Sequence, residues 1–137
     1  MEGDNRMLVQ IMQKKLKTIP EGLSITQAAE KMQKEGIGSL LVERKGVPVG
    51  IITDTAIVHK AVGVKKDLDH TTVESLMTTP LPTIQVTQTS HDALDMMGDL
   101  GIRHLVVCDG PQIVGLVSAR DLLVYFGSVS EPRIGVD

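Results

Sequence analysis

Residues 115–121, Gly-Leu-Val-Ser-Ala-Arg-Asp, run from an apolar strand into the start of a helix. Beyond them, Leu122 and Phe126 follow the spacing of a helix that buries one face. The first turn of a helix leaves backbone N–H groups unpaired at the positive end of its dipole, and together these attract an anion. Helical side chains lean toward the N-terminus, so the carboxylate of Asp121 returns to the junction at Ser118. The junction therefore offers groups for both an anion and a hydroxyl-bearing ligand.

The same two side chains also fit a purely structural interpretation. Ser-x-x-Asp at a helix start resembles a capping box, in which Ser118 caps the N–H of Asp121 and the carboxylate caps Ser118. These residues alone leave both interpretations open. The rest of the chain has to decide between them.

The chain contains an internal duplication. When the sequence is shifted by 65 positions, residues 11–58 lie over residues 76–123 without a gap, and twelve of the forty-eight pairs are identical. Chance would give about three identical pairs on ordinary residue frequencies. The matches include Met12 with Met77, Thr18-Ile19 with Thr83-Ile84, Gly36-Ile37 with Gly101-Ile102, and Val49-Gly50 with Val114-Gly115. One supersecondary unit is therefore present twice.

Each copy predicts the order β-α-β-β-α, which is an α/β (α+β) fold. In the first copy an extended piece at Thr18-Ile19 precedes a helix that is capped by Ser24 and ends at Gly36. Two strands then form a hairpin around Lys45-Gly46, and a closing helix runs over about residues 54–62. The second copy predicts the same elements, with Thr89 as the cap, Gly101 at the helix end and Asp109-Gly110 at the turn.

This pattern predicts the domain organisation. We expect repeat 1 at residues 7–63, a polar linker at 64–72, repeat 2 at 73–127 and a loosely held tail at 128–137. Short lead-in helices are expected before each repeat. A unit of about fifty residues buries its apolar faces poorly by itself, so we expect the repeats to pack about a pseudo-two-fold axis, with a ligand cleft at the seam.

The composition of the 137-residue chain argues against several classes of function. A net charge of −3 offers no basic field to nucleic acid or anionic lipid, and one Tyr, one Phe and no Trp leave little for bases to stack on. No apolar run approaches the length of a membrane span, and the N-terminus lacks the pattern of a signal peptide. We therefore expect a cytoplasmic protein that binds neither nucleic acid nor membrane.

Catalytic and metal chemistry find little support in the sequence. Cys108 is the single cysteine and lies in an apolar run, where a buried, inert thiol is expected. The four histidines are scattered without metal-ligand spacing, so we expect no metal. No nucleophile with an adjacent base and no phosphate loop is found, and only His104 with Asp121 could be imagined as an acid–base pair. We therefore expect neither an enzyme nor a resident cofactor.

The two repeats resemble a known family. Gly-Ile-Arg-His-Leu-Val-Val at 101–107, an Asp-Gly turn and Gly-Leu-Val-Ser-Ala-Arg-Asp at 115–121, within tandem units, are similar to a pair of cystathionine-beta-synthase (CBS) domains, or Bateman module. The resemblance covers roughly residues 7–127. In that family the pair binds adenosine-containing ligands between the repeats, and two pairs commonly assemble into a flat disc.

The resemblance implies a stand-alone regulatory module that senses AMP, ADP, ATP or another adenosyl ligand. It also implies a homodimer in the form of a four-CBS disc and an unidentified protein that the module regulates. The alternative is a structural homodimerisation module without a bound ligand.

The resemblance further implies roles for individual residues. Asp121 would take the ribose hydroxyls, while Ser118 and Arg120 would meet phosphate. From repeat 1, Thr18 and Ile19 would receive the adenine edge. The base would be lined by aliphatic or small residues, namely Leu23, Ile37, Gly38, Leu40 and Leu116. Arg103 and His104 match positions that in relatives point toward phosphates near the disc centre; Arg supplies a forked donor, and His could make the contact pH-sensitive.

Repeat 1 departs from the pattern at its own helix start. It keeps Thr53, but Ala56 stands where the ribose carboxylate is expected, and a methyl group accepts no hydrogen bond. Asp54 adds a negative charge that would compete with phosphate for the helix dipole. The second cleft, with Thr53, Thr83, Ile84 and Ile102, is therefore expected to be weak, empty or used by a different ligand.

Overall fold

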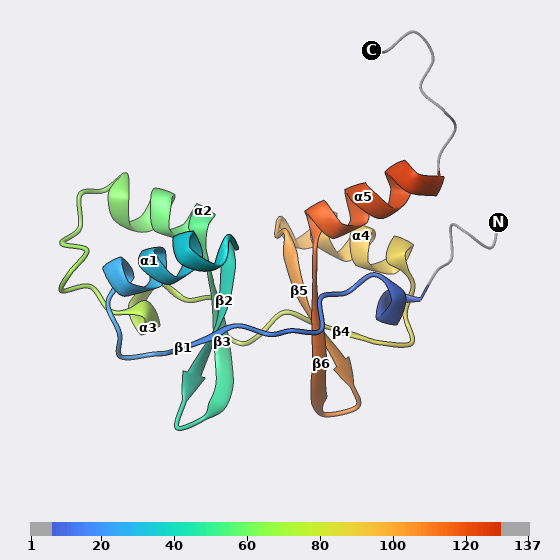
Figure 1. The fold of residues 1–137 in the computed structure, drawn as a ribbon, viewed down its shortest axis with the longest axis horizontal. Coiled ribbons are helices and arrows are strands. Elements are labelled where there is room, and N and C mark those ends of the chain that lie inside the picture. The colour runs from blue at the N-terminus through green and yellow to red at the C-terminus, as the bar shows by residue number, and fades with distance from the viewer. Residues whose placement is uncertain (1–6, 130–137) are drawn as a thin grey trace, which may run out of the picture. The chain divides into compact units, whose positions relative to one another are not determined.

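A computed structural model describes residues 7–129, which form two compact units (Figure 1). One unit comprises residues 16–81 and is called the 16–81 unit. The other joins residues 7–15 to residues 82–129 and is called the 82–129 unit. Most of the predicted tail, residues 130–137, lies outside the described residues.

The 16–81 unit contains a three-stranded sheet of order β1-β2-β3, in which β1 is parallel and β3 antiparallel to β2. Its elements are β1 (Thr18–Pro20), α1 (Ile25–Glu35), β2 (Ser39–Arg44), β3 (Val47–Thr53), α2 (Asp54–Ile57), the π-helix η3 (Val58–Val62) and α3 (Val73–Leu76). Its core is formed by apolar side chains from the sheet and from all of these helices: Ile19, Ile25, Ala28, Met32, Leu40, Val42, Ile52, Ile57, Ala61, Val73 and Leu76.

The 82–129 unit repeats this arrangement with a sheet of order β4-β5-β6. Its elements are η2 (Leu8–Gln10), β4 (Thr83–Gln85), α4 (Ser90–Leu100), β5 (His104–Asp109), β6 (Gln112–Ser118) and α5 (Ala119–Val129). Its core consists of Leu8, Ile84, Ala93, Met97, Leu105, Val107, Val117 and Leu122. The α/β class and the repeated β-α-β-β-α order are confirmed.

The ends of α1 and α4 are as predicted. Ser24 and Thr89 each accept a hydrogen bond in a capping box, with Gln27 and Asp92 as the reciprocal partners. Gly36 and Gly101 follow the helices with φ of 68° and 67°, respectively, and both adopt the left-handed conformation. Glycine reaches this conformation without a steric penalty, which is why it ends both helices.

Two local features differ from the expectation. In the second hairpin Asp109 pairs with Gln112, so the turn residues are Gly110 and Pro111, one position later than predicted. The closing helix of repeat 1 changes at Val58 into a π-helical turn, in which the Gly63 N–H donates to the Val58 carbonyl at 2.7 Å. A Cβ at Gly63 would lie 3.0 Å from that carbonyl oxygen, so glycine permits the wider turn to close.

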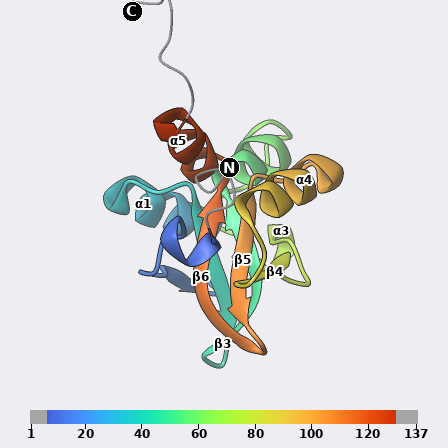
Figure 2. The ribbon, with the colours of Figure 1, turned by 90° about the vertical axis from the view of Figure 1, so that its right-hand side faces the viewer.

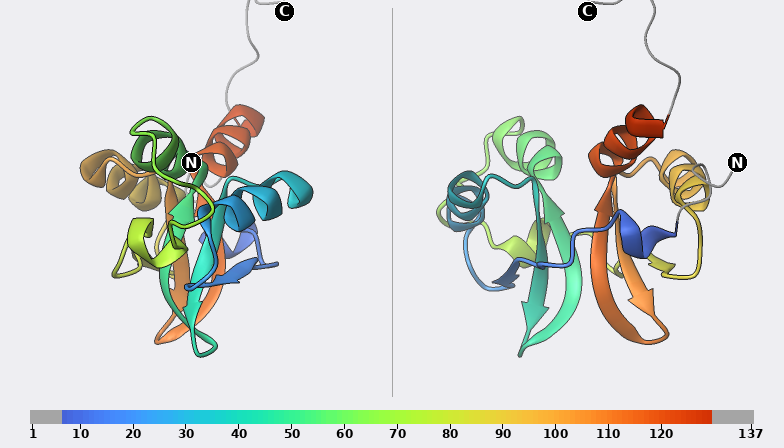
Figure 3. Two further views of the ribbon diagram at one scale, coloured as in Figure 1. Left: turned by 90° about the vertical axis from the view of Figure 1, so that its left-hand side faces the viewer. Right: turned by 45° about the vertical axis from the view of Figure 1, so that its right-hand side comes forward.

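The lead-in segments are exchanged between the repeats. Residues 7–13, which begin repeat 1 in the sequence, pack in the 82–129 unit (Figure 2). There Leu8 is fully buried, and Gln13 forms two backbone hydrogen bonds with Leu116 of β6. The segment that carries α3 packs in the 16–81 unit (Figure 3). There Thr78 forms two backbone hydrogen bonds with Ile51 of β3. Each compact unit is therefore completed by residues from the other sequence repeat.

Between residues 7 and 129, none of the helices combines the length and the apolar character that crossing a bilayer requires.

Candidate ligand site at the start of α5

The junction between β6 and α5 is built by pairing with the neighbouring strand. His104 lies opposite Ser118 at the edge where β5 begins and β6 ends. The N–H of Ala119 donates to the Arg103 carbonyl at 2.8 Å, so one of the unpaired donors of the first helical turn is satisfied there. These bonds fix the direction in which α5 leaves the sheet.

The carboxylate of Asp121 is held at both oxygens. The Ser118 N–H donates to Oδ2 at 2.9 Å, and the Asp121 N–H donates to the Ser118 hydroxyl oxygen at 3.1 Å, which together form a capping box. Gln13 Nε2 donates to Oδ1 at 3.1 Å. The structural interpretation of Ser118 and Asp121 is therefore realised, and two of the four acceptor positions of the carboxylate are occupied.

A cavity of about 510 Å³ opens beside this carboxylate. Its lining comes from η2, from the segment after it and from α5: Gln10, Ile11, Gln13, Arg120, Asp121, Val124, Tyr125 and Ser128. The volume lies within the range of small-molecule sites. Arg120 is exposed, whereas Tyr125 is only 5% exposed. The cavity thus combines a guanidinium, a carboxylate, two amides and an apolar wall.

Of the eight lining residues, only Arg120 and Asp121 were predicted from the sequence. Gln10, Ile11 and Gln13 were missed because they belong to the other sequence repeat, and Val124, Tyr125 and Ser128 because they lie beyond the predicted motif. A signal was available in the duplication. The identical pairs Met12/Met77 and Gly50/Gly115 make equivalent contacts in the two units. A Cβ at Gly115 would collide with the side chain of Met12, and a Cβ at Gly50 would collide with the side chain of Met77. These pairs indicate that each lead-in segment contacts a glycine-containing strand, but they do not say which methionine meets which glycine.

The predicted site residues of repeat 1 all lie in the 16–81 unit. Ile19 and Leu40 are each 1% exposed and belong to its core, so only their backbone groups could meet a ligand. The Thr18 carbonyl on β1 accepts a hydrogen bond from Lys31 Nζ at 2.6 Å. Leu23 and Ile37 are partly buried against the core. That these residues of repeat 1 line one cleft together with Ser118 and Asp121 stays a prediction.

The remaining predicted residues have defined backbone roles. Gly38 accepts the Asp54 N–H at 2.9 Å, and a Cβ on it would lie 2.8 Å from an Asp54 carboxylate oxygen. Leu116 forms the bridge with Gln13. Arg103 is exposed, and His104 is half-buried at the start of β5.

The equivalent corner of repeat 1 lacks the carboxylate. The Thr53 hydroxyl accepts the Ala56 N–H at 3.1 Å and so caps α2 without a reciprocal acid. The Asp54 carboxylate accepts the Thr55 N–H at 2.7 Å. Of the other residues predicted for the second cleft, Thr83 is exposed on β4, whereas Ile84 and Ile102 pack in the core of the 82–129 unit.

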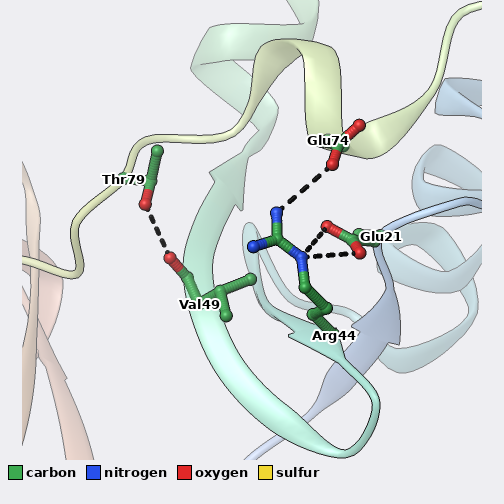
Figure 4. Close-up of polar contacts among 5 residues, drawn as sticks. All are labelled: Glu21, Arg44, Val49, Glu74 and Thr79. Carbon is green, nitrogen blue, oxygen red and sulfur yellow. Dashed lines mark hydrogen bonds and ion pairs between the residues drawn. The ribbon is translucent and has the colours of Figure 1, made fainter.

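A charged cluster on the surface contacts the exchanged segment of the 16–81 unit. Arg44 Nε donates to both carboxylate oxygens of Glu21, at 3.0 and 2.8 Å, and Arg44 Nη2 reaches Glu74 of α3 at 3.3 Å (Figure 4). The hydrogen bond from Arg44 lowers the pKa of Glu21, and the same pairing raises the pKa of Arg44. Thr79 beyond α3 donates its hydroxyl to the Val49 carbonyl at 2.8 Å.

The described residues 7–129 contain no group of three His, Cys, Asp or Glu side chains placed to hold a metal ion. Cys108 is buried, and this burial raises the pKa of its thiol. Nothing in this part of the chain points to a reactive thiolate.

Comparison with known proteins agrees with the fold and the duplication. The model of the CBS domain matches the chain twice, at residues 8–63 and 73–128. The chain belongs to the CBS domain family. The two matches to the CBS model cover most of the chain, and the resemblance inferred from the sequence is confirmed.

Proteins similar to this chain occur in archaea and bacteria. An uncharacterised protein of Methanopyrus kandleri is 35% identical over 71% of this chain and 50% of its own length, so the chain spans half of that relative. The CBS domain-containing protein YhcV of Bacillus subtilis is 30% identical over 78% of this chain and 76% of its own. A solved structure from Burkholderia ambifaria, also with CBS domains, is 25% identical and has a TM-score of 0.86 over 96% of this chain and 100% of its own.

Proposed function

We propose that this CBS pair is a regulatory module that binds an adenine nucleotide, AMP, ADP, ATP or another adenosyl ligand, at the start of α5. The observation that carries the proposal is the cavity of about 510 Å³ beside Asp121 and Arg120. A carboxylate suits the hydroxyls of a sugar, and an exposed guanidinium suits a phosphate, to which it donates two parallel hydrogen bonds. A cytoplasmic location is part of the proposal.

The capping role of Asp121 is compatible with this binding. Its two bonds from Ser118 and Gln13 leave one acceptor position on each carboxylate oxygen. The apolar wall of Ile11, Val124 and Tyr125 offers burial to the rest of the ligand.

Calorimetric titration of the wild type and of Asp121→Ala with AMP and ATP tests the proposal. We expect binding by the wild type and at least tenfold weaker binding by the variant, because hydrogen bonds to a charged group are each worth about 1.5–3 kcal/mol. Ala56→Gly, at the matching position of repeat 1, is the control and should bind like the wild type. Equal affinities of wild type and Asp121→Ala, or no heat with any adenosyl ligand, would contradict the proposal.

The second candidate is a homodimerisation module without a ligand. Leu123 and Val124 on α5 are 71% and 66% exposed, which favours a contact with another chain. A four-CBS homodimer is compatible with either function, so the two candidates differ in ligand dependence. Sedimentation of the wild type and of Leu123→Glu, each with and without ATP, separates them: a dimer that is lost in the variant and unaffected by ATP favours the structural module.

A further inference from the structure

The side chain of Gln13 reaches the proposed binding carboxylate from the exchanged segment. Its Nε2 donates to Asp121 Oδ1 at 3.1 Å, and Gln13 and Asp121 both line the cavity. The backbone of Gln13 is fixed independently by two hydrogen bonds with Leu116, at 2.8 and 2.9 Å. The amide therefore reaches the carboxylate from a fixed backbone position, and removing it leaves the backbone hydrogen bonds with Leu116 intact.

Together, Gln13 and Ser118 determine the orientation of the carboxylate. Ser118 N–H holds Oδ2 at 2.9 Å, while Gln13 holds Oδ1. Without Gln13 the carboxylate would be fixed at one oxygen only and could rotate about its terminal bond, whose torsional preference is broad. A carboxylate fixed at both ends presents one remaining acceptor position on each oxygen, and two adjacent hydroxyl groups match this pair.

The other repeat lacks this arrangement. Shifted by 65 positions, Thr78 takes the place of Gln13 and Ala56 that of Asp121. The backbone bridge is nevertheless the same, since Thr78 exchanges two hydrogen bonds with Ile51 at 2.8 and 3.0 Å. The Gln13–Asp121 contact is therefore not required to seat a lead-in segment on its sheet.

We propose that Gln13 is a positioning residue that makes the cavity selective for a ligand with two adjacent hydroxyl groups, such as an unmodified ribose. This inference rests on the proposed function, because it deepens the account of the same site. Gln13 acts through Asp121: it aligns Oδ1 for the second hydroxyl, whereas Oδ2 is aligned by the Ser118 backbone. The effect of Gln13 should therefore depend on whether the ligand carries both hydroxyls.

The test is calorimetric titration with AMP, 2′-deoxy-AMP, 3′-deoxy-AMP and ribose 5-phosphate. The variants are Gln13→Ala and Gln13→Glu, which keeps the length of the side chain but has no donor when ionised. Thr78→Ala is the matched control. We expect Gln13→Ala to bind AMP about tenfold more weakly and one of the two deoxy analogues within about twofold of the wild type, as loss of one aligned hydrogen bond predicts. Gln13→Glu should lose more affinity for AMP than Gln13→Ala, and Thr78→Ala should bind AMP like the wild type.

The outcomes separate this inference from the proposed function. Equal weakening of AMP and both deoxy analogues in Gln13→Ala, or no weakening at all, overturns the role of Gln13 while nucleotide binding stands. If ribose 5-phosphate binds in a way that depends on Gln13 but AMP does not bind, the positioning role of Gln13 is supported and the proposal of an adenine nucleotide as the ligand is overturned. Absence of binding by the wild type with all four probes overturns both.

Discussion

At the start of α2 the Thr53 hydroxyl accepts the Ala56 N–H at 3.1 Å, and at the start of α5 the Ser118 hydroxyl accepts the Asp121 N–H at the same distance. The hydroxyl is thus explained by helix capping alone, because both repeats keep it. The carboxylate and the Gln13 amide occur at one corner only. Comparing the two helix starts therefore separates the group that caps the helix from the groups that are candidates for binding a ligand.

The exchanged segments differ in the same way. Both are bridged to their sheets through the backbone, at Gln13–Leu116 and at Thr78–Ile51. In the 16–81 unit the segment buries Val73 and Leu76 in the core, and its polar side-chain contacts include a surface ion-pair cluster centred on Arg44. In the 82–129 unit the side chain of Gln13 instead turns to the cavity. One segment therefore has only structural contacts, whereas the other also forms a wall of a candidate site.

The largest effect is expected from breaking the close approach that both units share. A Cβ at Gly50 would lie 2.8 Å from the Thr78 carbonyl oxygen, and at Gly115 the nearest backbone atom is the Gln13 carbonyl oxygen at 3.1 Å. Gly50→Ala should therefore lower the free energy of unfolding by about 2–3 kcal/mol, measured by urea denaturation, since overpacking has this cost.

Gly115→Ala tests the same close approach in the 82–129 unit. Its closest obstacle is the side chain of Met12, which can be shortened. The double variant Gly115→Ala with Met12→Ala should recover part of the loss, whereas Met77→Ala should recover less in Gly50→Ala, where the carbonyl remains. If both double variants recover the same free energy of unfolding, the Thr78 carbonyl is not the main obstacle to a Cβ at Gly50.

A smaller effect is expected from the capping box. Asp121→Ala removes the acceptor for the Ser118 N–H and should lower the free energy of unfolding by about 1 kcal/mol without ligand. Thermal denaturation without nucleotide measures this cost. A loss above about 3 kcal/mol would show that Asp121 has a structural role beyond the cap that its bonds describe.

The reverse substitution should give a smaller gain. Ala56→Asp would give the start of α2 a carboxylate that can complete a capping box with Thr53, as Asp121 does with Ser118 at the start of α5. Negative charge is favourable at a helix start. We expect about 0.5 kcal/mol of stabilisation in the same denaturation experiment. Destabilisation would indicate that Asp54, two residues before, already repels a second carboxylate there.

The smallest effect is expected from Arg44→Met, and it should depend on pH. Because Arg44 lowers the pKa of Glu21 in the folded protein, this pairing stabilises the fold above the ordinary glutamate pKa of 4.5 and is lost as pH falls through the lower folded value. The stability difference between wild type and variant should therefore be present at neutral pH and vanish in acid or in high salt. A difference that persists in acid would point to lost packing of the Arg44 stem.

Much of the fold could be predicted because its signals are local. Ser24, Thr89, Gly36 and Gly101 act through neighbours in the sequence, and the structure places each at the predicted helix end. The residues around the cavity were harder to predict, because Gln13 and Asp121 are separated by 108 positions. Such a pair has no periodicity or spacing that marks it.

The sequence by itself determined the duplication, the order of elements and the family, since these depend on local patterns and on self-similarity. Only the tertiary structure decided which lead-in segment completes which sheet. The physical reason is that the bridges at Leu116 and Ile51 are backbone hydrogen bonds, which any residue except proline can form. In each unit a glycine makes room for the methionine side chain beside the bridge. Through this exchange Gln13 reaches Asp121.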